Sequence, residues 1–416
     1  MSAKTKEFKI SKFLNRRGIL SALPKPILLA GLLVFAGSLV LVKAQAISAI
    51  LFEAEAGTRT GNASVVSDAN ASGGNALRFD SAPGTNPYAD VPSNFNVNDW
   101  LINNNDPLDD FSWEPSGGFR FLCQFSHLGY YDPIVYPGQA DKGHLHMFFG
   151  NKSIDHNSTY ASLRSSGEGS CPGGPINRTG YWMPAVFDAN DSNKVVIPSF
   201  FNVYYKDSPC PINQATLAAK QDCIRNTHDI PNGLRMIAGY DMNGPANQDS
   251  HIDWYCDTPN IVKTKYIPDS CLPGETLIVS VQFPTCWDGV NLDSPNHRSH
   301  VAYYYNDPEE GARCPATHQV HLPSLTEFAF FTNPGNISGW SLASDHMAGM
   351  THTDGSTFHA DWFGAWDNDI KLTWLQNCIR NMKSVHSGRL CNGKQLKEPP
   401  AYTGPTRISG YTVYSK

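Results

Sequence analysis

Histidines and aspartates gather in three short stretches of the sequence, and these stretches carry its clearest chemical signal. The first, DKGHLHMFFGN (141–151), holds His144 and His146 two residues apart. On an extended segment, side chains at this spacing point to the same face. Two imidazoles on one face can hold one metal ion or act as acid and base toward one substrate. Taken alone, the pair fits equally well two histidines that hydrogen-bond the backbone of a loop.

The other two stretches add Asp and aromatic residues to His. Segment 283–305 includes Trp287, Asp288, Asp293, His297, Arg298 and His300, and segment 349–369 includes His352, Asp354, His359, Asp361, Trp362, Phe363 and Trp366. His359 and Asp361 repeat the two-residue spacing of the first pair. Only 17% of the residues in the chain are charged. A solvated surface would be expected to use Lys and Glu, so the clustering of His, Asp and aromatic residues favours the lining of a cleft.

Two mechanisms use such residues, and the sequence leaves both open. In the first, a transition metal such as Zn or Cu is bound, and carboxylates orient the imidazole rings. The ligands expected for it are His144, His146, His359 and Asp361. In the second, no metal is bound, and Asp and His share general acid and base duty. The catalytic residues expected for it are His144, His146, Asp288, His300, His359 and Asp361.

Aromatic and basic neighbours of these residues suggest a sugar as the ligand. Trp287, Trp362 and Trp366 would form a platform on which sugar rings stack, with Arg298 as a further binding residue. The alternative for each tryptophan is a place in the core. The sequence contains no G-x-S-x-G, no H-E-x-x-H and no phosphate-binding P-loop. Standard serine hydrolases, zincins and P-loop enzymes are therefore excluded.

The composition bounds the class of protein that must position these groups. The chain has 416 residues, 34 Gly, 29 Pro and 11% aromatic residues, which is typical of a loop-rich, mainly β protein. Its formal net charge is −6 and no long basic stretch follows the N-terminus, so nucleic-acid binding is not expected.

The N-terminal residues 1–46 carry an export signal. Several Lys and Arg precede the uncharged apolar run PILLAGLLVFAGSLVLV (26–42), and Ala44-Gln45-Ala46 offers the small residues that a signal peptidase cleaves after. An uncleaved N-terminal membrane anchor is the alternative, and it would be the chain's one contact with a membrane. Both interpretations place the body of the protein outside the cell or at its surface.

Cysteine usage agrees with export. All ten Cys lie between Cys123 and Cys391, and there is no C-x-x-C motif. An even number in an exported chain indicates disulfides. Because short loops cost the least entropy to close, neighbours are expected to pair. The expected pairs are Cys123–Cys171, Cys210–Cys223, Cys256–Cys271, Cys286–Cys314 and Cys378–Cys391.

The chain divides into a short N-terminal part and one large domain. Segment 47–80 is rich in Gly, Ser and Asn and resembles the opening of β-sandwich carbohydrate-binding modules with an E-A-E motif. That resemblance implies a calcium or sugar site at Glu53 and Glu55. Residues 81–105 are Pro-rich and are predicted as a linker, and the main β domain is expected over 106–416.

The main domain alternates short apolar runs with Gly, Pro and Asn turns. The runs are rich in β-branched and aromatic residues and predict strands at 118–125, 194–205, 234–240, 276–283, 299–305 and 327–332. Helices are predicted at 212–226 and at 367–383, the second capped by Asp367. The expected fold is mainly β, an antiparallel, jelly-roll-like β-sandwich with two peripheral helices and disulfide bonds.

Six ordered motifs between Asp106 and Cys391 resemble a known secreted family. They are DPIVYPG with GHLH (132–146), YWMPAVF (181–187), GLRMIAG (233–239), FPTCWDG (283–289), SPNHRSHVAY (294–303) and GSTFHADWFGAW (355–366). The family occurs in fungi and bacteria, and its domain is catalogued as having unknown function. The resemblance implies export, a disulfide-bonded domain and a cell-wall or polysaccharide setting, but no reaction. This chain has Gly143 where the family has Ser, and Ala365 interrupts the usual G-W.

Three functions therefore compete. We expect foremost a carbohydrate-active hydrolase or lyase whose His/Asp/Trp cleft acts on polysaccharide. A non-catalytic protein that binds cell-wall glycan would use the same residues, and so would an extracellular transition-metal-binding protein. Carboxyl pairs across a groove would favour a glycosidase, whereas His and Asp atoms converging on one point would favour a metal.

Overall fold

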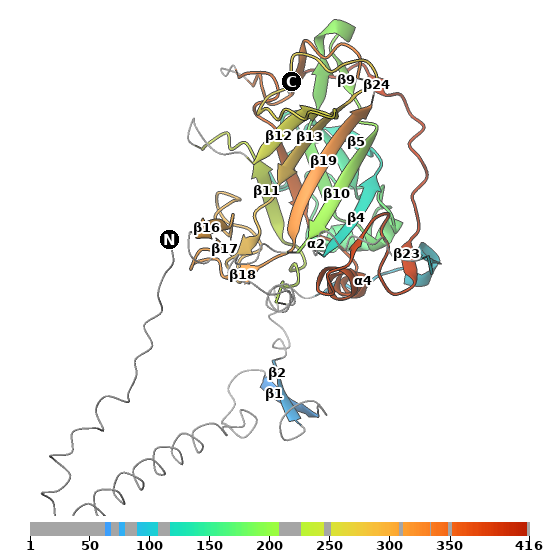
Figure 1. Ribbon diagram of the computed structural model, residues 1–416, viewed down its shortest axis with the longest axis vertical. Helices are drawn as coiled ribbons and strands as arrows, with labels where there is room; N and C mark the ends of the chain where they lie inside the picture. Colours follow the sequence, from blue (N-terminus) through green and yellow to red (C-terminus); the bar gives the residue numbers. More distant parts are fainter. Residues whose placement is uncertain are drawn as a thin grey trace, which may run out of the picture. The chain divides into compact units, whose positions relative to one another are not determined.

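The protein divides into two compact units, Met1–Pro87 and Tyr88–Lys416. The computed structural model (Figure 1) describes residues 63–67, 75–79, 90–106, 117–207, 226–244, 251–307, 311–332, 334–347 and 352–413. In the first unit this is the antiparallel pair β1 (Ala63–Ser67) and β2 (Asn75–Phe79). The predicted export segment 1–46, Glu53, Glu55 and the helix predicted at 212–226 lie outside the described residues.

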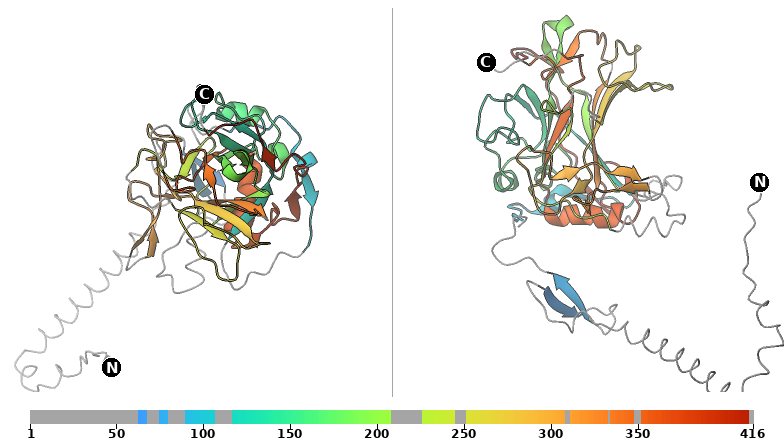
Figure 2. Two further views of the ribbon diagram at one scale, coloured as in Figure 1. Left: turned by 90° about the horizontal axis from the view of Figure 1, so that it is seen from above. Right: turned by 90° about the vertical axis from the view of Figure 1, so that its left-hand side faces the viewer.

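Two antiparallel sheets form the body of the second unit (Figure 1, Figure 2). The first has six strands in the order β12 (Ile252–Cys256), β13 (Thr276–Gln282), β19 (Ser324–Thr332), β10 (Phe200–Lys206), β4 (Gly118–Cys123) and β22 (Ser384–Val385). The second has five, in the order β11 (Arg235–Gly239), β21 (His359–Phe363), β7 (Gly180–Pro184), β6 (His146–Gly150) and β5 (His127–Gly129). Only the short β22–β4 pair within these sheets is parallel.

The inner faces of the two sheets pack on each other and form the main core. Phe149 of β6 stacks on Phe201 of β10 with ring centroids 4.1 Å apart. Trp362 of β21 donates a hydrogen bond from its indole to the Tyr205 hydroxyl of β10 at 3.0 Å. These contacts join strands of opposite sheets, so the predicted antiparallel β-sandwich is confirmed.

The outer face of the five-stranded sheet is also covered, and this determines where the candidate site lies. Phe148, Trp182 and Phe363 on that face form a second apolar cluster with Ile134 and Leu163 from the covering segment, among others. The segment ends in helix α2 (Tyr160–Ser165), whose N-cap Thr159 forms a capping box with Ser162. A sheet buried on both faces gives up the simple apolar–polar alternation of a half-exposed one.

Smaller elements surround the sandwich. The remaining strands are β20 (Trp340–Leu342), β8 (Val186–Asp188), β9 (Lys194–Val196) and β24 (Arg407–Ile408) in one sheet, β15 (Val301–Ala302), β14 (Cys286–Trp287) and β18 (Val320–His321) in another, and the pairs β16 (Tyr305–Asp307) with β17 (Gly311–Arg313) and β23 (Lys394–Leu396) with β3 (Leu101–Asn103). The short 3₁₀ helices are η4 (Val97–Trp100), η5 (Gly174–Ile176) and η6 (Ala189–Asp191).

The helix predicted at 367–383 is present but shorter. Asp367 accepts a hydrogen bond from the Ile370 N–H and caps α4 (Asn368–Trp374), which continues as the π-helical turn η7 (Leu375–Ile379). The other α-helix of the described residues is α2, which the sequence did not predict. No helix in the described part of the chain has the length and apolarity needed to cross a membrane.

Four of the five predicted disulfides are confirmed: Cys123–Cys171, Cys256–Cys271, Cys286–Cys314 and Cys378–Cys391. Cys210–Cys223 lies outside the described residues. The bonds indicate folding in an oxidising, extracellular environment.

Residues 90–105, predicted as part of a linker, belong to the second unit. β3 pairs with β23, and Ser93 donates a hydrogen bond to Asp367 at 2.5 Å. Tyr160 likewise donates to Asp90 at 2.9 Å. The Pro-rich composition suggested a free linker, but here it accompanies a segment that packs along the domain.

Candidate metal centre

Three histidines from two distant segments meet on the outer face of the five-stranded sheet. His144 precedes β6, His146 begins it, and His359 begins β21. Their ring centroids lie 4.1 Å (144–146), 5.0 Å (144–359) and 5.9 Å (146–359) apart. One nitrogen of each ring lies within 4.8 Å of one nitrogen of each other ring. His359 thus joins His144 and His146, although it lies more than two hundred residues later in the chain.

Hydrogen bonds fix the tautomers of two of these rings. His146 Nδ1 lies 3.0 Å from the Tyr131 carbonyl oxygen, and His359 Nδ1 lies 2.9 Å from that of Thr357. A backbone carbonyl only accepts, so each Nδ1 carries the proton and each Nε2 keeps its lone pair. His146 Nε2 is buried without a hydrogen-bond partner, and so is His144 Nε2, although the His144 side chain is partly exposed.

The environment keeps all three rings uncharged. Burial lowers the pKa of His146 to about 4 and that of His359 to about 3, where the neighbouring His146 adds to the effect. Burial, with the two neighbouring rings, holds the pKa of His144 well below its usual value. At neutral pH the rings are neutral imidazoles, the form in which histidine binds metal.

Two buried carboxyl groups adjoin the histidines. Asp132, His146 and Asp361 each place a ligand atom within 4.8 Å of the others. Asp132 Oδ1 accepts hydrogen bonds from the Ile134 and Val135 N–H groups at 2.8 and 2.9 Å. Both carboxyl oxygens of Asp361 are buried and have no partner. Burial and the Asp132 carboxyl raise the pKa of Asp361, and the positive charge of Arg298 opposes that rise.

The structure splits the predicted ligand set of His144, His146, His359 and Asp361 into two overlapping groups. Asp361 groups with His146 and Asp132 rather than with all three histidines. Asp132 was not included among the predicted site residues, because it stands in a turn fourteen positions before His146. Its place as the first residue of the DPIVYPG motif was the one signal that could have pointed to it.

The motif SPNHRSH (294–300) lies at the edge of the sheet and adds no ligand to the group. Arg298 donates hydrogen bonds to the carbonyls of Ile237 and Gly239, and His300 Nε2 donates to that of Arg235 at 2.7 Å. The three carbonyls belong to every second residue of β11. Because β11 is the edge strand of its sheet, the motif covers the unpaired side of that strand. His300 therefore does not belong to the group of His144, His146 and His359.

Asp288 lies in an exposed loop, and its carboxylate is occupied locally. It accepts hydrogen bonds from the Val290 and Asn291 N–H groups and from the Asn291 amide at 2.7–2.9 Å. These bonds outweigh the desolvation of the group and lower its pKa. This is the environment of a loop-capping carboxylate, not of a general acid.

The three tryptophans predicted as a sugar platform are in the core. Trp287, Trp362 and Trp366 are 3%, 1% and 1% exposed. The indoles of Trp362 and Trp366 both donate hydrogen bonds to the Tyr205 hydroxyl. Because none of the rings presents a face to solvent, the predicted platform is wrong for this structure.

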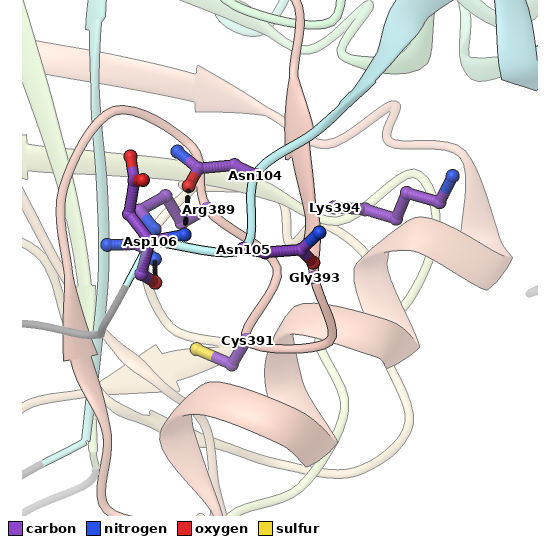
Figure 3. A pocket seen from close by; sticks show the side chains of 7 residues that line it. All are labelled: Asn104, Asn105, Asp106, Arg389, Cys391, Gly393 and Lys394. Carbon is purple, nitrogen blue, oxygen red and sulfur yellow. Dashed lines mark hydrogen bonds between the residues drawn. The ribbon is translucent and has the colours of Figure 1, made fainter.

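A surface pocket of about 220 Å³ lies elsewhere on the second unit (Figure 3). It is lined by Asn104, Asn105, Asp106, Arg389, Cys391, Gly393 and Lys394. Its cations are engaged, because Lys394 Nζ donates to the Asn103 side chain at 2.6 Å and Arg389 donates to the Asp106 carbonyl. No predicted site residue is in its lining.

Comparison with known proteins returned one match. Residues 132–366 match the family model described as "Domain of unknown function (DUF1996)". No curated protein and no solved structure matches the chain. The matched region begins at Asp132, ends at Trp366 and contains the complete histidine and carboxyl group described above. Since it covers more than half of the 416 residues, the chain belongs to this family of unknown function.

Proposed function

We propose that this protein is an exported metal-binding protein whose His144, His146 and His359 hold one divalent transition-metal ion. The observation that carries the proposal is the convergence of three neutral imidazoles, with buried Nε2 atoms of His144 and His146 left without any partner. A buried polar atom without a partner costs free energy and calls for an explanation. A shared ion would satisfy these lone pairs at once.

The ligand chemistry supports a particular class of ion. Imidazole nitrogens suit Zn, Cu, Ni or Co, whereas Mg and Ca prefer oxygen ligands. The backbone carbonyls of Tyr131 and Thr357 act as the outer hydrogen-bond partners that orient metal-bound histidines in proteins. Three protein nitrogens leave a fourth position of a tetrahedral ion for water or substrate, as in catalytic zinc sites.

The adjoining carboxyl groups support the same proposal. A divalent ion among three neutral rings brings two positive charges into a buried site, which is unfavourable without compensation. Asp132 and Asp361 stand beside His146 and would supply two negative charges. Asp361, which has no hydrogen-bond partner, is free to take up this role.

Export and the glycan setting belong to the proposal as well. The N-terminal apolar run and the disulfides support secretion or an N-terminal anchor. The expected polysaccharide enzyme or glycan-binding protein would use the same centre. We rest the proposal on metal because the three indole rings that would have stacked on sugar are buried.

Metal analysis tests the proposal. Purified full-length protein is chelated, reloaded with Zn²⁺ or Cu²⁺, dialysed and measured by mass spectrometry. We expect one ion per chain in the wild type and less than 0.1 in His146→Ala and His359→Ala. His228→Ala is the matched control, because that exposed ring lies outside the group. A wild type without stoichiometric metal, or a His359→Ala protein that binds as well as wild type, would refute it. Loaded protein is then screened against glycans.

A further inference from the structure

Ser294 and His300 form a hydrogen-bonded pair that lies outside the proposed metal centre. Ser294 Oγ is 3.0 Å from His300 Nδ1. Ser294 is partly exposed, whereas His300 behind it is only 1% exposed. An accessible hydroxyl backed by a buried imidazole is the arrangement that activates a serine for nucleophilic attack.

The hydrogen bonds of His300 determine which nitrogen is basic. Its Nε2 lies 2.7 Å from the Arg235 carbonyl oxygen. Since that oxygen can only accept, Nε2 carries the proton and Nδ1 has the lone pair. The Arg235 carbonyl thus orients the ring, as the third group does in serine–histidine sites.

The Ser294 hydroxyl has two acceptors within reach. Its Oγ donates to Asn296 Oδ1 at 3.0 Å and lies 3.0 Å from His300 Nδ1. Asn296 Oδ1 also accepts the N–H groups of Arg298 and Ser299 at 3.2 and 2.9 Å, so it has two other donors. His300 Nδ1 has no other donor among the bonds of the described residues, so the one hydroxyl proton is shared between the amide oxygen and the imidazole nitrogen.

The loop that carries the pair is held in place. The His297 N–H closes a tight turn onto the Ser294 carbonyl at 2.8 Å, with Pro295 inside the turn. His297 has a φ of 56°, a left-handed conformation that non-glycine residues seldom adopt and that accumulates at functional sites. Arg298 fastens the loop to the carbonyls along β11. The distance between Ser294 and His300 is therefore set by fixed backbone.

We propose that Ser294 is a nucleophile and His300 its general base, in a site that transfers the acyl group of a carboxylic ester to water. Ser294 Oγ attacks the ester carbonyl carbon while its proton passes to His300 Nδ1. The bond from carbonyl carbon to alkoxy oxygen then breaks, and the alcohol leaves with that proton. Water, deprotonated by His300, attacks the acyl-serine, releases the carboxylic acid and restores the hydroxyl.

The electrostatics around His300 suit this role. Burial lowers its pKa, and the bond to the Arg235 carbonyl and the charge of Asp293 partly offset the effect. The ring is therefore neutral at neutral pH and can accept a proton. Asp293 itself is paired with Arg235 at 3.1 Å and with His297 at 2.9 Å, so it is held beside the site.

The test uses full-length protein after chelation, so that loss of metal binding would not affect its outcome. A fluorophosphonate probe is added and the labelled peptide is located by mass spectrometry, and hydrolysis of 4-nitrophenyl acetate is followed in parallel. We expect one adduct, on Ser294, and a hydrolysis rate at least about 100-fold lower in Ser294→Ala, because that variant lacks the nucleophile. Ser299→Ala, an exposed serine in the same loop, should behave as wild type.

Two results would overturn the proposal. One is folded wild type that carries no adduct on Ser294. The other is a Ser294→Ala protein that hydrolyses the ester at the wild-type rate. Labelling of the wild type needs no variant, so a substitution that prevents folding does not remove the test. A failure here leaves the metal proposal standing, and a metal-free wild type leaves this one standing.

Discussion

Glu327→Gln should make the protein progressively more stable than wild type as the pH rises. Glu327 lies on the inner face of β19, directly opposite Val203 and Val281, and is 1% exposed. Both of its carboxyl oxygens are buried without a partner. Burial, with a smaller contribution from Asp361, raises its pKa well above 4.5. The folded protein therefore holds Glu327 as a neutral acid at pH values where the unfolded chain is ionised.

The sign and size of the effect follow from proton linkage. A raised pKa in the folded state gives a stability contribution that is complete below the unfolded pKa, near 4.5, and is lost as the pH rises toward the folded pKa. Over that window the native state binds one proton more, so wild type loses about 1.4 kcal/mol per pH unit. Glutamine does not titrate. Its advantage should thus grow by about 1.4 kcal/mol for each pH unit between the unfolded and the folded pKa of Glu327.

Urea unfolding at pH 5, 6 and 7 with disulfides intact measures this difference. Replacing the carboxyl by an amide can change the free energy of unfolding by an amount that does not depend on pH. That amount cancels, because only the change with pH in the difference between variant and wild type is compared. Glu168→Gln is the control, since that side chain is 75% exposed and its difference from wild type should not vary. A difference between Glu327→Gln and wild type that stays constant over the three pH values would show that the carboxyl is ionised or solvated in the folded state.

Four further outcomes test the packing of the second unit and the proposed metal centre. Asp345→Ala should cost at least about 3 kcal/mol in urea unfolding, because the carboxylate accepts bonds from Leu342, Gly355 and Thr357 at 2.6–3.2 Å. Gly150→Ala should cost more than about 3 kcal/mol, since its Cβ would lie 1.9 Å from the Thr179 carbonyl oxygen. Gly138→Ala, also at positive φ but with open space around it, should cost only about 1 kcal/mol. Metal at one hundred times its dissociation constant should stabilise wild type by about 2.7 kcal/mol, but not His359→Ala.

Local features of the sequence predicted the structure well. Neighbouring cysteines such as Cys378 and Cys391 pair because the chain between them is short, and Asp367 caps the helix where its side chain indicated. The rings of His144 and His146 do lie side by side, with centroids 4.1 Å apart. In each case the responsible contact spans few residues, so the sequence itself contains most of the information.

Features that depend on the other sheet or on covering loops were not predictable. Trp362 alternates with Asp361 along β21, and the sequence could not say that both faces of this strand are buried. The sequence left open whether Trp362 belongs to a sugar platform or to the core, and in the structure it packs against Tyr205 of the opposite sheet. Ser294 was passed over because no G-x-S-x-G surrounds it. The position of its partner His300 depends on a turn and on the Arg235 carbonyl at the edge of β11, and only the fold brings these two together.

Unpartnered buried atoms alone do not identify a binding site, and Glu327 shows why. It shares with Asp361 a buried carboxyl group without hydrogen bonds. Among the described residues, however, no group of converging ligand atoms includes Glu327, whereas Asp361 lies with Asp132 and His146 in one such group. An isolated buried carboxyl can lower its free energy only by staying protonated. A convergent set can instead share a cation, which satisfies several atoms together. This difference is why we expect Glu327→Gln to stabilise the protein, and expect substitutions at His146 or His359 to abolish metal binding.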